Sequence, residues 1–300
     1  MITSKQTGKT DPSIGRVRFN FTKSFWLWGM MTPTIFFGAQ SVSLKLCIIT
    51  LILTFFGICL GHSVGLHRCL IHQSFQCGSF LRGLLAWLSV LAGLGGPITW
   101  ARIHGVRDYW QNRLDCPPYF AYKHSMFKDF IWNLHLSFHP ADNRADEKLP
   151  PHLLTDPWLN FLEKTWPLHH LAIASIIYLT LGAEGVVICV CSRITGGILG
   201  HWAIGYASHA WGEQPHRQEG ASEHGTNNWL LGVLSFGEGF HNNHHAYPQS
   251  ARMGLAPLDF DLGWWVVLLL KRLNLIHSVK CAGRGEVVLG NASARIRIPS

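Results

Sequence analysis

The stretch GEGFHNNHH, residues 237–245, places three histidines within five positions. His241, His244 and His245 stand at positions i, i+3 and i+4, so a helix would project all three from one face. Imidazole nitrogens are common ligands of iron, zinc, copper and nickel. Three of them on one face can hold a metal ion with open coordination positions. The stretch therefore predicts a metal site.

Two other stretches repeat this concentration of histidine. They are GHSVGLHRCLIH, residues 61–72, and WARIHGVRD, residues 100–108. A lone histidine, such as His152 or His277, is ordinarily satisfied by one hydrogen bond. A cluster that only senses pH is not expected to recur at three places. With 18 histidines in 300 residues, the three stretches together indicate metal chemistry.

The chain as a whole is too apolar for a soluble protein. Hydrophobic residues make up 48% and charged residues only 14%, whereas soluble proteins carry about 25% charged residues. The mean hydropathy is +0.15. This composition excludes a disordered chain and indicates an integral membrane protein with sizeable polar segments. The eight cysteines form no C-x-x-C pair and are expected to be small buried side chains.

The distribution of charge predicts the topology. Four apolar runs are expected to cross the membrane as two helical hairpins: about residues 25–38, 44–60, 168–181 and 185–206. Lys and Arg crowd the segments outside these hairpins, so both termini and both polar blocks are expected in the cytoplasm. The net charge of +8 is interpreted as this membrane topology and not as nucleic-acid binding. Arg193, inside the last run, needs a partner or water.

The same distribution of charged and apolar residues predicts that the chain has three parts. Residues 1–23 are expected to form a cytosolic arm, residues 24–275 a membrane domain, and residues 276–300 a cytosolic tail. Within the membrane domain, residues 261–275 are short and amphipathic, which is typical of an interfacial helix.

The three histidine stretches resemble the histidine boxes of the membrane-bound fatty acid desaturases. His67-Arg68 followed by His72 is similar to the first box, and residues 237–248 are similar to the third. Trp100 and His104 stand where the second box begins. The resemblance covers about residues 25–275. It implies an all-α membrane protein in which four transmembrane helices, in two hairpins, carry a cytosolic helical cap whose histidines hold two iron ions.

The resemblance also implies an activity. The family removes two hydrogens from an acyl chain, with O2 as co-substrate and electrons from a separate carrier. An external donor such as a ferredoxin or a cytochrome b5-like protein is expected, and the acyl group could be carried by CoA, acyl carrier protein or phospholipid. The absence of an ER retrieval motif favours a bacterial cytoplasmic membrane. A related lipid hydroxylase and a catalytically silent metal- or lipid-binding membrane protein are the alternatives.

A fifth apolar run, residues 84–98, is expected not to cross the membrane. His72 precedes it and His104 follows it, and the resemblance places both at one metal centre. A single crossing would put about 30 Å of bilayer between them. The glycines and Pro97 near its end fit a helix that lies on, or dips into, the interface.

The second stretch departs from the family pattern. Where the family has two adjacent histidines, this chain has Arg107 and Asp108. Arg107 stays protonated and cannot be a ligand, whereas Asp108 could bind iron or pair with Arg107. His209, His201 and His62 are candidate additional ligands at the ends of spans. The expected metal-site residues are His67, His72, His104, His209, His241, His244 and His245, with Asp108, His201 and His62 as possible replacements.

Overall fold

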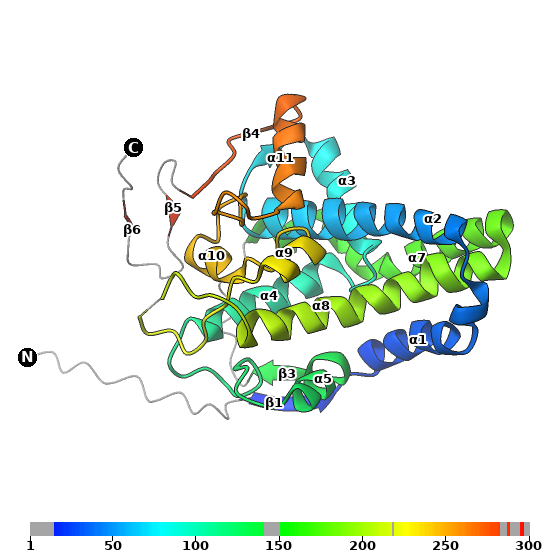
Figure 1. The fold of residues 1–300 in the computed structure, drawn as a ribbon, viewed down its shortest axis with the longest axis horizontal. Helices are drawn as coiled ribbons and strands as arrows, with labels where there is room; N and C mark the ends of the chain where they lie inside the picture. Colours follow the sequence, from blue (N-terminus) through cyan, green and yellow to red (C-terminus); the bar gives the residue numbers. More distant parts are fainter. Residues whose placement is uncertain (1–14, 141–150, 218, 283–286, 289–294, 297–300) are drawn as a thin grey trace, which may run out of the picture.

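The computed structural model describes residues 15–140, 151–217, 219–282, 287–288 and 295–296. Long helices fill most of the molecule and run along its longest axis, while short helices and loops gather at one end (Figure 1). The long helices are α1 (Phe21–Ser41), α2 (Leu44–Thr54) with the π-helical segment η1 (Phe55–Ile71), α7 (Pro157–Gly185), and η3 (Val186–Ser192) with α8 (Arg193–Ala210). The shorter helices are α3 (Ser79–Val90), α4 (Pro97–Gln111), α5 (Met126–His135), α6 (Pro151–Thr155), α9 (Trp229–Leu234), α10 (His241–Ala246) and α11 (Leu262–Arg272).

The described residues form three short antiparallel strand pairs, of which the first two join segments far apart in the sequence. They are β1 (Gly15–Phe19) with β3 (Leu136–Pro140), β2 (Gln76–Cys77) with β4 (Ile276–His277), and β5 (Val287–Val288) with β6 (Arg295–Ile296). The segment expected to be a simple arm therefore ends in a strand, and α1 begins at Phe21, capped by the Asn20 side chain. Residues 1–14 of that arm and most of residues 283–300 lie outside the described residues.

In the described part of the chain, two helical stretches are long and apolar enough to cross a membrane, Leu44–Ile71 and Pro157–Ala210. The second has 54 residues, which would be about 81 Å if it were straight. It reverses direction at Gly182, which has φ +70°, a conformation that glycine adopts without strain. Helix α7 and segment η3 then pack side by side. A short turn joins the first two apolar runs, α1 and α2, and α1 packs mainly on η3.

Helix α3 runs antiparallel along η1 in close contact. Three glycines of η1, four residues apart, form the contact: a Cβ on Gly65 would meet Leu85, one on Gly61 would meet the backbone of Leu88, and one on Gly57 would meet the backbone around residues 91–92. Glycine permits this close approach because it has no side chain. The chain then turns, with positive φ at residues 93 and 95, and α4 follows.

Polar side chains from other helices satisfy the backbone of this turn. Trp26 donates from Nε1 to the carbonyl of Gly93 at 2.9 Å. Arg193 donates from Nη1 to the carbonyl of Leu91 at 2.8 Å. His170 Nε2 lies 3.0 Å from the carbonyl of residue 90, and Glu163 accepts from the amides of residues 98 and 99 at the start of α4. The partner that Arg193 requires is therefore this turn.

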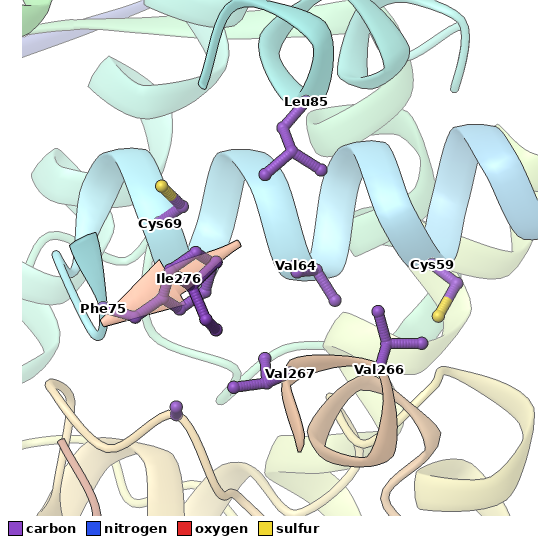
Figure 2. Packing of buried hydrophobic residues seen from close by; sticks show 9 residues of the cluster. Cys59, Val64, Cys69, Phe75, Leu85, Val266, Val267 and Ile276 are labelled. Carbon is purple, nitrogen blue, oxygen red and sulfur yellow. The ribbon is translucent and has the colours of Figure 1, made fainter. Parts of the chain in front are cut away.

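One buried core lies where η1, α3 and α11 meet. Val64 and Cys59 of η1 belong to one buried cluster with Leu85 of α3 and with Val266 and Val267 of α11 (Figure 2). All five are buried, Cys59, Val64 and Val267 completely. Helix α11 exposes its other face, as expected for the amphipathic stretch over residues 261–275. This core fixes η1, and η1 carries the first histidines of the site.

Candidate metal centre

A first group of four histidines gathers at the end of η1. His67 and His72 come from this end, His104 from α4 and His244 from α10, and their ligand atoms all lie within 4.8 Å of one another. The Nε2 atoms of His67 and His104 are 2.9 Å apart. Two nitrogens that bind one ion at about 2.1 Å and at right angles would be about 3.0 Å apart. The group therefore has the dimensions of a metal site.

The winding of η1 places His67 and His72 on one face. In a π-helix the backbone bonds connect residues five apart, and the amide of His72 bonds to the carbonyl of His67 at 3.1 Å. Residues five apart therefore stack along one side, and the two rings have centroids 4.8 Å apart. An ordinary α-helix, with 3.6 residues per turn, would turn these side chains well away from each other.

A second group contains His209, His241 and His245. His209 comes from the end of α8, and the other two come from α10. The Nε2 atoms of His241 and His245 are 3.0 Å apart. Helix α10 thus serves both groups, since His244 belongs to the first. His241 and His245, four residues apart, lie in this second group, whereas His244, at i+3 from His241, lies in the first.

Several ring nitrogens in the groups are buried without hydrogen-bond partners among the described residues. They include Nε2 of His72, Nδ1 of His244 and both ring nitrogens of His209. Burial lowers the pKa of His72 and His244 well below the usual value, so these rings are neutral and keep a lone pair. A neutral imidazole is the form that binds metal. These unpartnered nitrogens fit two metal ions better than they fit a closed protein core.

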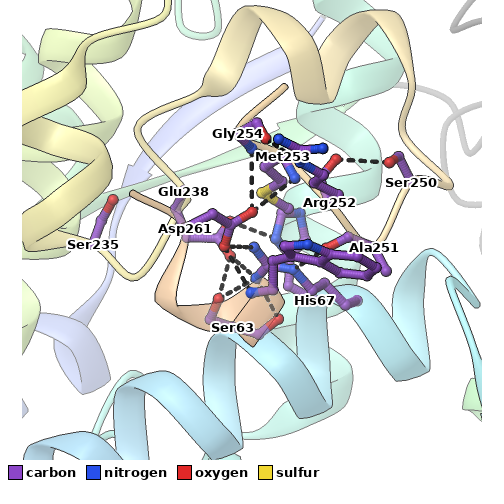
Figure 3. Close-up of polar contacts among 12 residues, drawn as sticks. Ser63, His67, Ser235, Glu238, Ser250, Ala251, Arg252, Met253, Gly254 and Asp261 are labelled. Carbon is purple, nitrogen blue, oxygen red and sulfur yellow. Dashed lines mark hydrogen bonds and ion pairs between the residues drawn. The ribbon is translucent and has the colours of Figure 1, made fainter. Parts of the chain in front are cut away.

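A buried network orients His67 from behind. Its Nδ1 lies 2.6 Å from Oε2 of Glu238, and Arg68 donates from Nη1 to Oε1 of the same carboxylate at 2.7 Å. Arg68 is completely buried and also contacts Asp261 at 3.1 Å. Figure 3 shows Ser63 and His67 facing Glu238 and Asp261. No role was predicted for these two carboxylates, although Glu238 lies in the third histidine stretch.

Asp108 lies behind His104 in the same manner. Its Oδ2 is 3.1 Å from Nδ1 of His104. Burial alone would raise the pKa of Asp108, but the His104 ring beside it more than offsets this and holds the pKa well below its usual range. Asp108 is in neither histidine group. Arg107 instead donates to Asn133 at 2.7 Å and lies over the ring of Tyr122.

His62 and His201 form a separate pair beside the first group. Their ring centroids are 5.0 Å apart, and Trp100 lies against His62, at 4.2 Å between centroids. Trp100 also lies 5.3 Å from His104. Neither histidine belongs to a metal group. His62 is buried, and its Nδ1 has no partner in the described part of the chain, whereas His201 is exposed.

Other histidines of the described residues also lie outside both groups. His135 contacts Ser24, and His170 contacts the turn after α3. One aromatic contact was not predicted: the ring of Tyr122 stacks on His209 at 4.2 Å between centroids. Tyr122 lies in a loop with no motif around it, so no signal in the sequence pointed to it.

The fold and the two histidine groups define a mostly helical protein with two candidate membrane-spanning stretches and two groups of histidines that could hold metal ions. The family model described as fatty acid desaturase matches residues 43–259. The sn-2 palmitoyl-lipid 9-desaturase of Nostoc sp. (strain 36) is 33% identical over 225 residues, covering 74% of this chain and 76% of the relative. The sn-1 stearoyl-lipid 9-desaturase of Anabaena variabilis is 33% identical, covering 76% and 81%.

A plant relative extends the comparison. The acyl-CoA C20 Delta5-desaturase of Anemone leveillei is 30% identical, covering 73% of this chain and 69% of the relative. The chain belongs to the fatty acid desaturase family, and it is an oxidoreductase that acts in lipid metabolism.

Proposed function

We propose that this protein is an O2-dependent di-iron desaturase that introduces a double bond into a fatty acyl chain. The observation that carries the proposal is the pair of adjacent histidine groups that share α10. The two iron ions, when bound, would supply the oxygen activation needed to remove hydrogen from an unactivated methylene, which no side chain provides. Electrons would come from an external ferredoxin or cytochrome b5-like donor.

The chain's own residues would bind and orient the two ions. His67, His72, His104 and His244 would hold one, and His209, His241 and His245 the other. Glu238 and Asp108 would fix the ring orientation of His67 and His104 through their Nδ1 atoms, as carboxylates do behind metal-bound histidines. The ionised Asp108 would also add negative charge to a site that otherwise has only neutral ligands.

Asp108 has a second possible role, as a ligand of the three-histidine group. Its negative charge raises the pKa of His241 and His245 relative to the effect of burial alone, which indicates that it lies near both rings. An ion held by three histidines has open positions, and carboxylate oxygen is a suitable iron ligand. His201 and His62 would act beside the first group without binding iron, because neither joins a group in the structure.

We propose a membrane placement with four crossings. Helix α1, α2 with η1, α7, and η3 with α8 would cross, the shorter helices would form the cytosolic cap, and both termini would face the cytosol of a bacterial inner membrane. The parts proposed from the sequence are kept: an arm over residues 1–23, a membrane domain over 24–275 and a tail over 276–300. Helices α3 and α4 would enter and leave on the same side, which keeps His72 and His104 together.

The acyl carrier is proposed to be a membrane lipid. Of the three relatives described above, two carry the word lipid in their names and one carries acyl-CoA. Acyl-CoA and acyl carrier protein are the other carriers to be tested. A hydroxylase built on the same site would differ only in its product, which gains one oxygen instead of losing two hydrogens.

Fatty acid profiling and metal analysis together test the proposal. The full chain is expressed in a host with known lipids, and its fatty acids are compared with those from the His244→Ala and His241→Ala variants, one from each group. We expect a new unsaturated fatty acid with the wild type alone, about two iron ions per chain, and less iron in each variant. A hydroxylated product would favour the hydroxylase, and zinc or no metal would favour a silent binding protein.

A further inference from the structure

A groove lies on the outer side of α3, away from both histidine groups. Helix α3 forms one wall with Phe80, Leu84 and Trp87, and the start of α7 forms the other with Trp158. Its volume of about 640 Å³ falls in the range of roughly 300–1,000 Å³ that is typical of ligand pockets. No residue of either histidine group lines it.

The groove walls are held by hydrogen bonds between elements. Trp158 donates from Nε1 to the carbonyl of Gly83 at 3.0 Å, which joins α7 to α3. Trp87 donates from its ring nitrogen to His169 of α7 at 3.3 Å. Both indole rings therefore have fixed positions, and the groove does not depend on a ligand to form. A preformed site spends little free energy on ordering itself when it binds.

The groove combines one charged pair with apolar side chains of α3 on either side of it. Arg82 and Asp156 form an ion pair at 2.9 Å, and both are partly exposed. Because α3 runs antiparallel to η1, this pair lies toward the end of η1 that carries His67 and His72. Leu84 and Trp87 follow further along α3, where the walls are apolar. Arg82 uses one nitrogen on Asp156, and a guanidinium has five N–H donors.

We propose that this groove binds one phospholipid of the surrounding membrane. Arg82 would bind the phosphate, since the planar guanidinium matches phosphate oxygens, and one acyl chain would lie along Leu84, Trp87 and Trp158. A ligand with a charged head and an apolar tail matches this combination of charged and apolar residues. Tryptophans are also enriched where a protein meets the membrane interface. The site is independent of iron and of the reacting acyl chain.

Native mass spectrometry of the full-length protein in detergent tests this assignment. The protein is titrated with dioleoyl phosphatidylethanolamine and with dioleoylglycerol, which has the same chains but no phosphate. We expect the wild type to bind the phospholipid at least about tenfold more tightly, the difference expected for a charge-assisted hydrogen bond. Arg82→Gln should remove this preference and leave binding of dioleoylglycerol unchanged.

Two further variants separate the groove from a general effect. Gly83→Leu should weaken binding of both lipids about tenfold, because the new side chain would enter the groove beside Trp158, whose Nε1 would lie 3.5 Å from its Cβ. If that variant does not fold, as judged by its unfolding temperature, Leu84→Gln serves the same purpose. The matched control is Arg113→Gln, since Arg113 forms a similar ion pair with Asp115 outside the groove. Equal binding of both lipids by the wild type, or unchanged binding in the groove variants, would overturn the proposal.

Discussion

Replacing Glu238 by Gln tests how strongly the surrounding protein controls the iron site. The Glu238 carboxylate has three partners: Arg68 and Ser63 donate to its Oε1 at 2.7 Å and 2.5 Å, and Nδ1 of His67 lies 2.6 Å from its Oε2. Gln has nearly the same shape but offers one accepting oxygen and an N–H2 group that cannot accept. Because Arg68 is completely buried, the one oxygen of the new Gln side chain should stay with the Arg68 guanidinium. The amide would then face His67 and could no longer accept from its Nδ1.

The structure sets the expected size of this effect. One hydrogen bond involving a charged group would be lost, which is worth about 1.5–3 kcal/mol. Loss of a partner behind a metal-bound histidine typically lowers metal affinity by about 10–100-fold, which corresponds to about 1.4–2.7 kcal/mol. The two ranges agree. We therefore expect Glu238→Gln to weaken Fe(II) binding by about 10–100-fold and to lower the unfolding temperature by several degrees.

The assay is a competition titration of Fe(II) against a chelator, with purified protein in detergent. Glu213→Gln is the matched control, because Glu213 is exposed and belongs to neither histidine group, and it should leave Fe(II) affinity unchanged. If Glu238→Gln binds Fe(II) within twofold of the wild type, the carboxylate does not position His67, and the network around Arg68 serves folding alone.

Three other perturbations have definite outcomes. Arg193→Met should cost about 1–3 kcal/mol in a thermal unfolding measurement, because it leaves the carbonyl of Leu91 without its donor, whereas exposed Arg113→Met should change stability by less than about 0.5 kcal/mol. Gly61→Val should separate α3 from η1 and lower bound iron, since a Cβ there would lie 2.2 Å from the backbone of Leu88; normal iron content would contradict this packing. The metal-free protein should lose thermal stability as the pH falls below 6.5, and constant stability there would refute the neutral state of four histidines of the two groups. Burial lowers the pKa of four histidines, so only the unfolded chain takes up these protons; they are His72, His241, His244 and His245. The free energy of unfolding should therefore fall by up to about 1.4 kcal/mol per pH unit for each histidine.

The resemblance to a known family indicated which histidines would meet, and the structure brings seven of the ten expected residues together in two groups. The resemblance also places His72 and His104 at one centre, and from this we predict that the intervening run does not cross the membrane. The groups themselves could not be derived in this way. His244 and His245 are adjacent in sequence but belong to different groups, and that division depends on how a six-residue helix is oriented between η1 and α8.

The winding of η1 is a second feature that spacing alone could not reveal. An α-helical reading places His62 and His67 on different faces, since five residues do not complete a whole number of turns. The π-helical bonding brings residues five apart onto one side. His62 nevertheless joins His201 and not the metal group. His62 lies five residues before His67 on η1, and the end of η1 nearest His104 and His244 already carries His67 and His72.

Arg193 shows why a charged residue in an apolar helix does not always mark the reacting site. Such a residue is a candidate for function by default, but here it donates to a turn 102 positions earlier in the chain. Trp26 and His170 donate to the same turn from two other helices. Non-helical backbone is tolerated at membrane depth only when other groups satisfy it. These side chains thereby fix where α4 begins, and the start of α4 determines where His104 meets the first metal group.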